Sequence, residues 1–466
     1  MADVLDTKLR RDLVANKGTL AAVVAIMALG AGSLVGIVGT YNNLLGARDR
    51  FYRQCRMADF WVDVRKAPSD ALQGVRDVPG VVRAGARIAR QVVVDLPGVA
   101  EPINSLALSL PPRDSHPIND IVLRSGSWFS SDEADEVIVS EKFAKARGLR
   151  PGMAVSLLAG GAKRTFRICG TAIAAEFVYL APPGALADMP GQYGVFFLPE
   201  RVAGRSFGME GAFNQVVGLL DASSAEAPGV VLAGVERVLA EHGVIAAIPR
   251  ALQFSNLTLG SDLAGLQAMA VMFPAIFFGV AALVLNVLMM RLAEQQRTTI
   301  GTLKALGYPD SAIFRHSVKF ALVAGLAGGV GGAILGGWIA EGFTAIYENF
   351  YVFPSVPLGF HGGLKLAGIV MAAGVAVLGS IRGVRKVVGL SPAEAMRPPA
   401  PASCGPVFLE RVGCLWRRLD FQWQMVLRAA LRNRGRTAAA VTSSALGSAM
   451  VVLAFGSYDS MNEMIR

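Results

Sequence analysis

The chain has 466 residues, of which 53% are hydrophobic and only 17% charged, and its mean hydropathy is +0.45. A typical soluble domain carries about 25% charged residues, so this composition argues against one large soluble enzyme and excludes a disordered chain. Nearly all of the net charge of +10 lies after residue 267, beside apolar runs rather than on a polar domain, so we expect no nucleic-acid partner.

Five runs are long and apolar enough to cross a bilayer, which takes about 20 mostly apolar residues. A charged segment, 1–18, precedes the first run, which is longer than the roughly 7–15 apolar residues of a signal peptide and is predicted to be a retained anchor. The predicted spans are 19–41, 268–290, 318–340, 364–381 and 437–458. We therefore predict a multi-pass α-helical membrane protein in contact with the lipid bilayer.

The Lys and Arg residues of the connecting segments predict the orientation, because short basic loops stay cytoplasmic. The loop 291–317 contains four basic residues and the linker 382–436 contains eleven, whereas the loop 341–363 contains none. The N-terminus and both basic segments are therefore expected in the cytoplasm. The long segment 42–267 and the loop 341–363 are expected outside.

The segment 42–267 has the pattern of a large α/β (mixed α+β) extracytoplasmic domain. Helix-like stretches cover 69–75, 141–147 and 229–242, and Gly148 and Gly243 are placed to end two of them. The runs with strand character are 59–64, 81–88, 91–96 and 136–140, together with a hairpin of 155–158 and 164–171 around Gly160 and Gly161.

No motif for catalysis, metal binding or nucleotide binding is found in the sequence, so we expect no catalytic residue, no metal site and no cofactor. The acidic run Ser131–Glu136 lacks the alternating ligands of a calcium loop and is predicted to be a solvated loop. Cys55 and Cys169 are predicted to be isolated small apolar residues, although an oxidising compartment would allow them to pair. Cys404 and Cys414 have no zinc-binding spacing.

The loop after the second span is predicted to form a short amphipathic helix over Glu294–Leu306, lying along the inner membrane face. Ile300, Leu303 and Leu306 share one stripe of it, and Gly307 is expected to end it in a left-handed conformation. Such a helix is either a connector or a docking element for a cytoplasmic partner.

The motif IGTLKALGY in this loop, preceded by Gln296 and Arg297, resembles the coupling segment of FtsX-like, MacB-like (type VII) ABC transporter permeases. SPAEAMRP, from Ser391 to Pro398, is similar to that family's exit motif, and the permease domain would cover about 268–398. DFWVDV, DEVIVSEKFAKARGLRPGMAVSL and FRICGTA resemble parts of its outer domain, here 42–267, the MacB-like periplasmic core domain.

The resemblance implies a multi-pass protein of the bacterial cell (inner or plasma) membrane that acts with a cytoplasmic ABC ATPase subunit, which alone binds ATP. It would export or extract an envelope substrate, with a periplasmic adaptor or envelope protein as a further partner. An FtsX-like signalling module that activates an envelope enzyme without transport is the alternative. The family usually has Glu where Thr299 stands, so that contact is in question. The remaining expected ATPase contacts are Arg297, Ile300, Gly301, Leu303, Lys304, Leu306 and Gly307.

Two further patterns concern assembly. Arg11–Gly18 (RDLVANKG) and Arg428–Gly435 (RAALRNRG) each precede an apolar run, which predicts a duplicated permease truncated early in its second half, or else a five-span protein. A second permease half or protomer is therefore an expected partner. Gly328, Gly332 and Gly336 form a small-residue ridge for close helix packing. The spans lack central ionisable residues, which disfavours an ion-coupled carrier.

Overall fold

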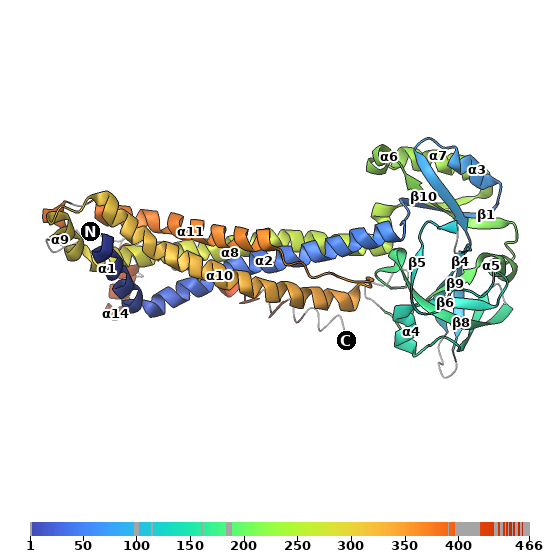
Figure 1. Ribbon diagram of the computed structural model, residues 1–466, viewed down its shortest axis with the longest axis horizontal. Helices are drawn as coiled ribbons and strands as arrows, with labels where there is room; N and C mark the ends of the chain where they lie inside the picture. The colour runs from blue at the N-terminus through green and yellow to red at the C-terminus, as the bar shows by residue number, and fades with distance from the viewer. Residues whose placement is uncertain are drawn as a thin grey trace. The chain divides into compact units, whose positions relative to one another are not determined.

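The computed structural model describes residues 2–96, 102–112, 115–159, 162–182, 189–389, 391–396 and 420–432, with short stretches between 437 and 459. The chain divides into two compact units (Figure 1). The helical unit comprises Met1–Thr40, Leu266–Glu341 and Gly359–Arg466, and the mixed unit comprises Tyr41–Gly265 and Gly342–Leu358.

Four helices among the described residues are long and apolar enough to cross a membrane. They are α2 (Lys17–Gln54), α8 (Phe254–Gln295), α10 (Asp310–Phe350) and α11 (Gly362–Val388). Each is longer than the predicted span, because the helix continues where the apolar run ends. In α2 the continuation is amphipathic, and Leu44, Ala47 and Phe51 are buried in the mixed unit.

Shorter helices flank these four. α1 (Ala2–Ala15) precedes α2, α9 (Arg297–Ala305) lies between α8 and α10, α12 (Pro392–Met396) follows α11, and α14 (Phe421–Arg432) comes last. The described residues of the predicted fifth span, 437–458, are helical, and the rest of that prediction lies outside the described residues. Most of the linker, with Cys404 and Cys414, also lies outside them.

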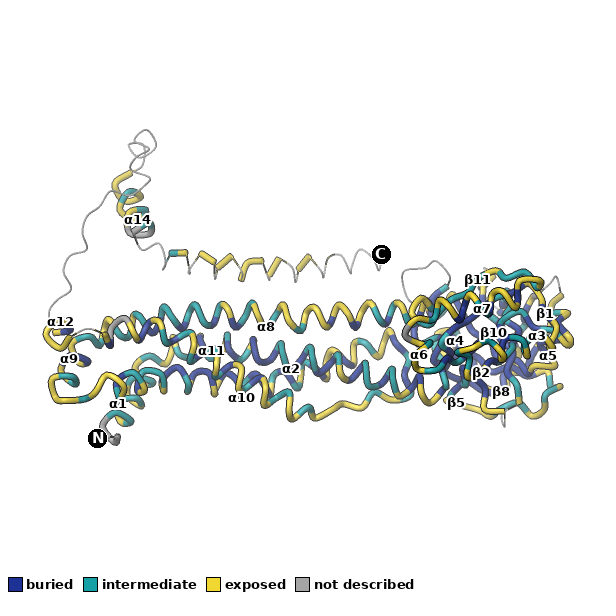
Figure 2. The backbone as a smooth tube through the Cα atoms, turned by 90° about the horizontal axis from the view of Figure 1, so that it is seen from above, coloured by how far each residue is buried: buried dark blue, intermediate teal, exposed yellow. Residues whose placement is uncertain are grey.

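Small residues let the helices of the helical unit pack closely. A Cβ atom added to Gly328, Gly332 or Gly336 of α10 would come within 2.6 Å of a side-chain atom of α2. On another face of α10, a Cβ on Gly325 would come 2.7 Å from Ala376 of α11. Figure 2 shows exposed positions along α10. Exposed apolar residues recur at every fourth position of this helix, as expected of a lipid-facing surface: Leu326, Val330, Ile334 and Trp338.

The mixed unit contains a four-stranded antiparallel sheet in the order β11-β1-β10-β2. Its strands are β1 (Phe60–Pro68), β2 (Val81–Arg87), β10 (Ala212–Leu220) and β11 (Val244–Pro249). Helices α3 (Ala71–Arg76) and α7 (Gly229–Leu239) pack on it around a shared core (Figure 1). Helix α6 (Ala222–Glu226) follows β10.

A second sheet has seven strands in the order β5-β8-β6-β9-β4-β3-β7. Because β7 also pairs with β8, this sheet closes on itself. Helices α4 (Glu141–Arg147) and α5 (Glu200–Phe207) each follow one of its strands. The strands are β3 (Ala89–Asp95), β4 (Ile103–Leu110), β5 (Ile121–Gly126), β6 (Glu136–Ser140), β7 (Ala154–Ala159), β8 (Ala162–Ala174) and β9 (Val195–Pro199).

Most local predictions for this domain agree with the structure. β6 leads into α4, and Gly148 ends α4 with φ of +67°. One prediction was wrong: the acidic run Ser131–Glu136 is not wholly solvated. Glu136, the first residue of β6, is buried, and its carboxylate pairs with Arg167 of the neighbouring strand β8 and accepts from the N–H of Ser130.

Candidate functional site

The loop between α8 and α10 holds most of the predicted site residues. Gln296 alone separates α8 from α9, and α9 ends at Ala305, so the prediction of one helix over 294–306 was wrong at both ends. The pattern of apolar residues continues past Gln296, so it does not predict the break between the two helices. The Nζ of Lys8, in α1, donates to the side-chain oxygen of Gln296 at 2.6 Å.

The C-terminus of α9 has a Schellman motif. Gly307 has φ of +90°, in agreement with the prediction, and its N–H donates to the carbonyl of Lys304 at 3.0 Å. The N–H of Tyr308 donates to the carbonyl of Leu303 at 3.1 Å. These two bonds satisfy carbonyls at the helix end and turn the chain toward α10.

The inner side of α9 packs on α12. Ile300 and Gly301 are buried. A Cβ atom at Gly301 would lie 2.9 Å from Cγ of Met396, 3.1 Å from Cβ of Ala395 and 3.3 Å from the carbonyl oxygen of Pro392. Only a glycine therefore fits here without displacing α12. The two segments that resembled family motifs, IGTLKALGY and SPAEAMRP, thus meet in space.

Helix α12 begins with a capping box. Ser391 Oγ accepts from the N–H of Glu394 at 3.3 Å, and the Glu394 carboxylate accepts from the N–H of Ser391 at 3.2 Å. The Ser391 N–H thereby holds the pKa of Glu394 below its usual value. Pro392 occupies the first helical position, where its missing N–H costs nothing. Arg397 and Pro398 of the predicted motif lie outside the described residues.

The two charged candidates, Arg297 and Lys304, make contacts within their own chain. Arg297 donates from Nη2 to the carbonyl of Glu394 at 2.7 Å. Lys304 donates from Nζ to the carbonyl of Val388 at 2.5 Å and pairs with Asp310 at 2.8 Å, and its side chain is only 8% exposed. Both residues fix α9 to neighbouring elements in this structure.

The predicted apolar stripe is divided by the fold. Ile300 and Leu303 face the core of the helical unit, whereas Leu306 is 68% exposed. Leu306 is the C-cap residue of α9, next to Gly307, at which the chain turns toward α10. The remaining exposed residues of this segment are Thr298, Thr299, Thr302, Ala305 and Gly307. The exposed surface of α9 is therefore short, neutral and polar, with Leu306 at its end.

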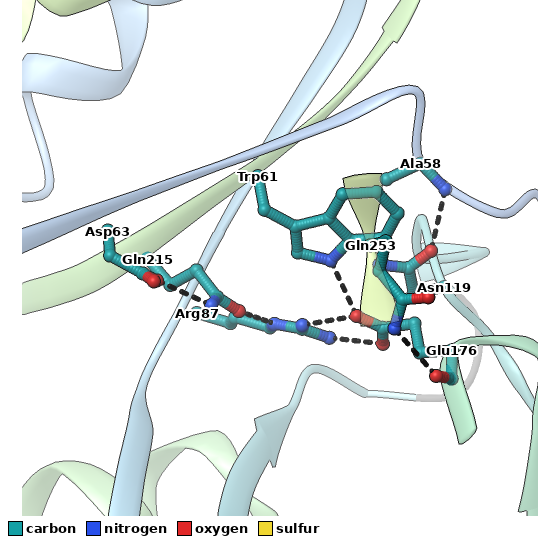
Figure 3. A network of polar contacts seen from close by, with 8 residues as sticks. All are labelled: Ala58, Trp61, Asp63, Arg87, Asn119, Glu176, Gln215 and Gln253. Carbon is teal, nitrogen blue, oxygen red and sulfur yellow. Dashed lines mark hydrogen bonds and ion pairs between the residues drawn. The ribbon is translucent and has the colours of Figure 1, made fainter. Parts of the chain in front are cut away.

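Sequence reasoning missed a polar network in the mixed unit (Figure 3). Glu176 lies in the 3-10 turn η2 (Ala175–Phe177) directly after β8, and its carboxylate accepts from Arg87 Nη1 at 2.7 Å and Nη2 at 2.6 Å. Trp61 Nε1 also donates to it at 2.6 Å. The available signal was a single carboxylate inside the otherwise apolar run from Ala172 to Ala181.

The cysteines, the possible metal ligands and the charged residues of one cleft are the remaining candidates for functional residues. Cys55 and Cys169 are free and buried, which confirms their interpretation as isolated apolar residues. Among the described residues, no group of His, Cys, Asp and Glu is arranged to hold a metal ion. An open cleft of about 550 Å³ in the mixed unit contains Glu133 and Arg201, which pair with each other at 3.0 Å.

Comparison with known proteins gives a family match over the segment that contains α9. Residues 271–392 match the family described as FtsX-like permease C-terminal. No curated protein matches the sequence. The matched range begins inside α8 and ends at the first residue of α12, so it contains all of α9.

The solved structures similar to the chain each cover less than half of it. The extracellular domain of the noncanonic ABC-type transporter YknZ from Gram-positive bacteria is 14% identical, with a TM-score of 0.27, over 40% of this chain and 89% of that one. The periplasmic region of MacB from Actinobacillus actinomycetemcomitans is 8% identical, with a TM-score of 0.29, over 46% of this chain and 95% of that one. The family match is confined to residues 271–392.

Proposed function

We propose, from the match of residues 271–392 to the FtsX-like permease C-terminal family, that the chain is the membrane subunit of an ABC transporter complex. Its ATPase is a separate cytoplasmic polypeptide that binds ATP. The complex exports or extracts an envelope substrate. The N-terminus and α9 face the cytoplasm, and the mixed unit lies outside, in keeping with the Lys and Arg bias of the loops.

The observation that carries this proposal is the placement of α9. A short helix held by glycine packing and two basic side chains presents a small exposed surface between two membrane-length helices. Leu306, 68% exposed at the end of that surface, is an apolar side chain that a partner can bury. The ATPase is the partner that the family implies for this segment.

The proposed mechanism is mechanical. Closure of the ATPase pair around ATP displaces α9, and α9 displaces α8 through the single residue Gln296. Helix α11 moves with them, because Lys304 binds the carbonyl of Val388 at its end and α12 packs on Gly301. α8 continues to Phe254 in the mixed unit, so the displacement reaches the outer domain along one helix.

The test is a substitution at Leu306. Leu306→Asp places a charge in the proposed contact, which costs a few kcal/mol and lowers ATPase occupancy about a hundredfold. Val14→Asp is the matched control, because Val14 is an apolar residue that is 70% exposed on another helix, α1. Leu303→Asp is unsuitable, because Leu303 packs against the core of its own unit.

The measurement is co-purification of an ABC ATPase, identified by its nucleotide-binding peptides, with each variant from membranes at equal permease level. We expect Leu306→Asp to lose the ATPase and Val14→Asp to retain it. Retention by both variants would show that α9 is a connector and would remove the basis of the proposal.

A further inference from the structure

One turn of the mixed unit is bound by the ends of two membrane-length helices. We define the anchor turn as Ala175–Val178. Gln253, just before α8, donates from Nε2 to the main-chain carbonyl of Glu176 at 2.8 Å. Val352, just after α10, donates its N–H to the carbonyl of Val178 at 2.9 Å. The N–H of Tyr179, next to the turn, donates to Ser255 Oγ of α8 at 2.9 Å.

The helix ends are also joined to one another. Tyr351 donates its hydroxyl to Asp262 of α8 at 2.8 Å, which connects the end of α10 to α8. Tyr52, near the end of α2, donates to Asn256 of α8 at 3.1 Å. The ends of α2, α8 and α10 therefore form one bonded group, and the anchor turn is attached to it through main-chain atoms.

The side chain of Glu176 points the other way, toward the four-stranded sheet (Figure 3). Arg87 is the last residue of β2, and Trp61 belongs to β1. The side chains of Arg87 and Glu176 are only 9% and 3% exposed. Arg87 Nε additionally donates to Gln215 of β10 at 2.6 Å, so three strands of the sheet are joined to the turn.

The chain connects the two sheets next to this pair. Only Ile88 separates β2 from β3, so Arg87 stands beside the residue at which the chain passes from the four-stranded to the seven-stranded sheet. The helices α2 and α8 are continuous in sequence with β1 and β11 of the four-stranded sheet, whereas the anchor turn belongs to the end of β8. A displacement of the helices therefore reaches the four-stranded sheet through covalent continuity with β1 and β11. It reaches the seven-stranded sheet through the anchor turn.

We propose that Glu176 is a positioning residue that locks the seven-stranded sheet to the four-stranded sheet and to the helix ends, so that both sheets move as one body when the helices move. The source of that movement rests on the proposed function, but the lock itself does not. A buried carboxylate that accepts two parallel bonds from one guanidinium holds a fixed direction as well as a fixed distance. Sliding of one sheet past the other would leave both charges buried and unpaired.

The experiment measures the distance between the two sheets in the full-length protein in nanodiscs. Spin labels are attached at Val82→Cys on β2, where Val82 is 67% exposed, and at Met153→Cys, beside β7, where Met153 is 44% exposed. The native cysteines are replaced by Ala at 55 and 169 and by Ser at 404 and 414. Pulsed electron paramagnetic resonance then gives the distance distribution.

We expect a single narrow distribution in the parent protein and its loss, as a broad distribution, in Glu176→Gln. Glu241→Gln, the same chemical change at an exposed position, is the control and should keep the narrow distribution. The double variant Arg87→Met with Glu176→Leu distinguishes loss of the contact between the sheets from general unfolding. Replacing a buried ion pair by apolar residues often preserves the stability of the fold. It should unfold cooperatively near the parent temperature and still show the broad distribution.

A second arm adds the ATPase, with ATP and vanadate to trap the closed state. In the parent the two labels should keep the same mutual distance at rest and in the trapped closed state, and in the double variant the distance should differ between these two states. A narrow, unchanged distribution in the double variant at rest would overturn the proposal. If no ATPase binds, only the proposed function is contradicted. The measurement without ATPase is sufficient to test the role of Glu176 in holding the two sheets together.

Discussion

The thiols of Cys55 and Cys169 are buried in the mixed unit, so their reactivity measures how well the unit excludes solvent. Burial raises the pKa of Cys55 to about 12 and that of Cys169 to about 11. Since the thiolate is the reactive form, and an ordinary cysteine has a pKa of about 8.5, both thiols should stay unmodified by maleimide at pH 8 in the native protein. Peptide mapping should find them modified only after denaturation. Rapid native labelling of either one would contradict the described packing.

The ionisation of Glu136 makes the stability of the mixed unit depend on pH, and the direction of that dependence follows from its pKa. Burial alone would raise its pKa, but the N–H of Ser130, at 2.7 Å, and the guanidinium of Arg167 hold the pKa below the usual value. A carboxyl group whose pKa is lower in the folded than in the unfolded chain stabilises the fold above its ordinary pKa. That contribution is lost as the pH falls below about 4.3 and through the lowered pKa.

We therefore expect Glu136→Gln to destabilise the mixed unit by about 1 kcal/mol at pH 7, a decrease of about 2–4 °C in Tm. The difference from the parent should shrink as the pH falls below about 4.3. Thermal unfolding followed by tryptophan fluorescence, at several pH values, measures it. A difference that grows toward acid pH would contradict the assigned sign.

At the scale of elements, the contact between α2 and α10 depends on single glycines. A Cβ atom on Gly332 would lie 2.6 Å from Cβ of Ala31 and 2.7 Å from the carbonyl oxygen of Ala28, distances that require the helices to separate. The neighbouring Gly331 has only Cβ of Ala28 nearby, at 3.8 Å, which is ordinary contact. Gly332→Ala should therefore destabilise the helical unit by about 1–3 kcal/mol, whereas Gly331→Ala should not.

Thermal unfolding of both variants in bicelles, followed by circular dichroism, compares these adjacent positions directly. The two substitutions add the same methyl group to the same helix, so lipid and propensity effects are matched. Equal stabilities would mean that α2 and α10 do not pack through this ridge.

The sequence predicted the elements whose signal is local. Membrane-length apolar runs identified α2, α8, α10 and α11, and the pattern from Glu136 to Gly148 identified β6, α4 and its left-handed end. Contacts between distant segments were not predictable in this way. Nothing local indicates that Gly301 packs on Met396 or that Glu176 pairs with Arg87, because each partner is fixed only by the folded chain.

The predicted apolar stripe of α9 was divided for the same reason, because burial depends on contacts that form only in the folded chain. The sequence pattern grouped Leu306 with Ile300 and Leu303, but Leu306 is the C-cap residue of α9 and is exposed, while the other two face the core. Helix α1 was also missed, although Leu9 and Leu13, four residues apart among charged neighbours, carry a weak amphipathic signal.

For the whole molecule, the Lys and Arg bias predicts which segments face outward. With Cys404 and Cys414 replaced by Ser, introduced cysteines at Asp135 and Asn349, both exposed, should react with a membrane-impermeant maleimide in intact cells. A cysteine at Leu306 should react only after permeabilisation. Leu306 is a better site than Lys304, whose side chain is only 8% exposed and would resist labelling from either side. Labelling at 306 in intact cells would reverse the proposed orientation.

We propose that the chain converts ATP hydrolysis by a separate ATPase into movement of its outer domain. The most direct test of this proposal is ATP turnover in proteoliposomes containing the chain alone, the co-purified ATPase alone, and both together with either parent or Leu306→Asp permease. We predict no turnover by the chain alone, turnover by the pair that exceeds that of the ATPase alone, and loss of this excess with Leu306→Asp. Turnover by the chain alone, or an excess that Leu306→Asp leaves intact, would contradict the account.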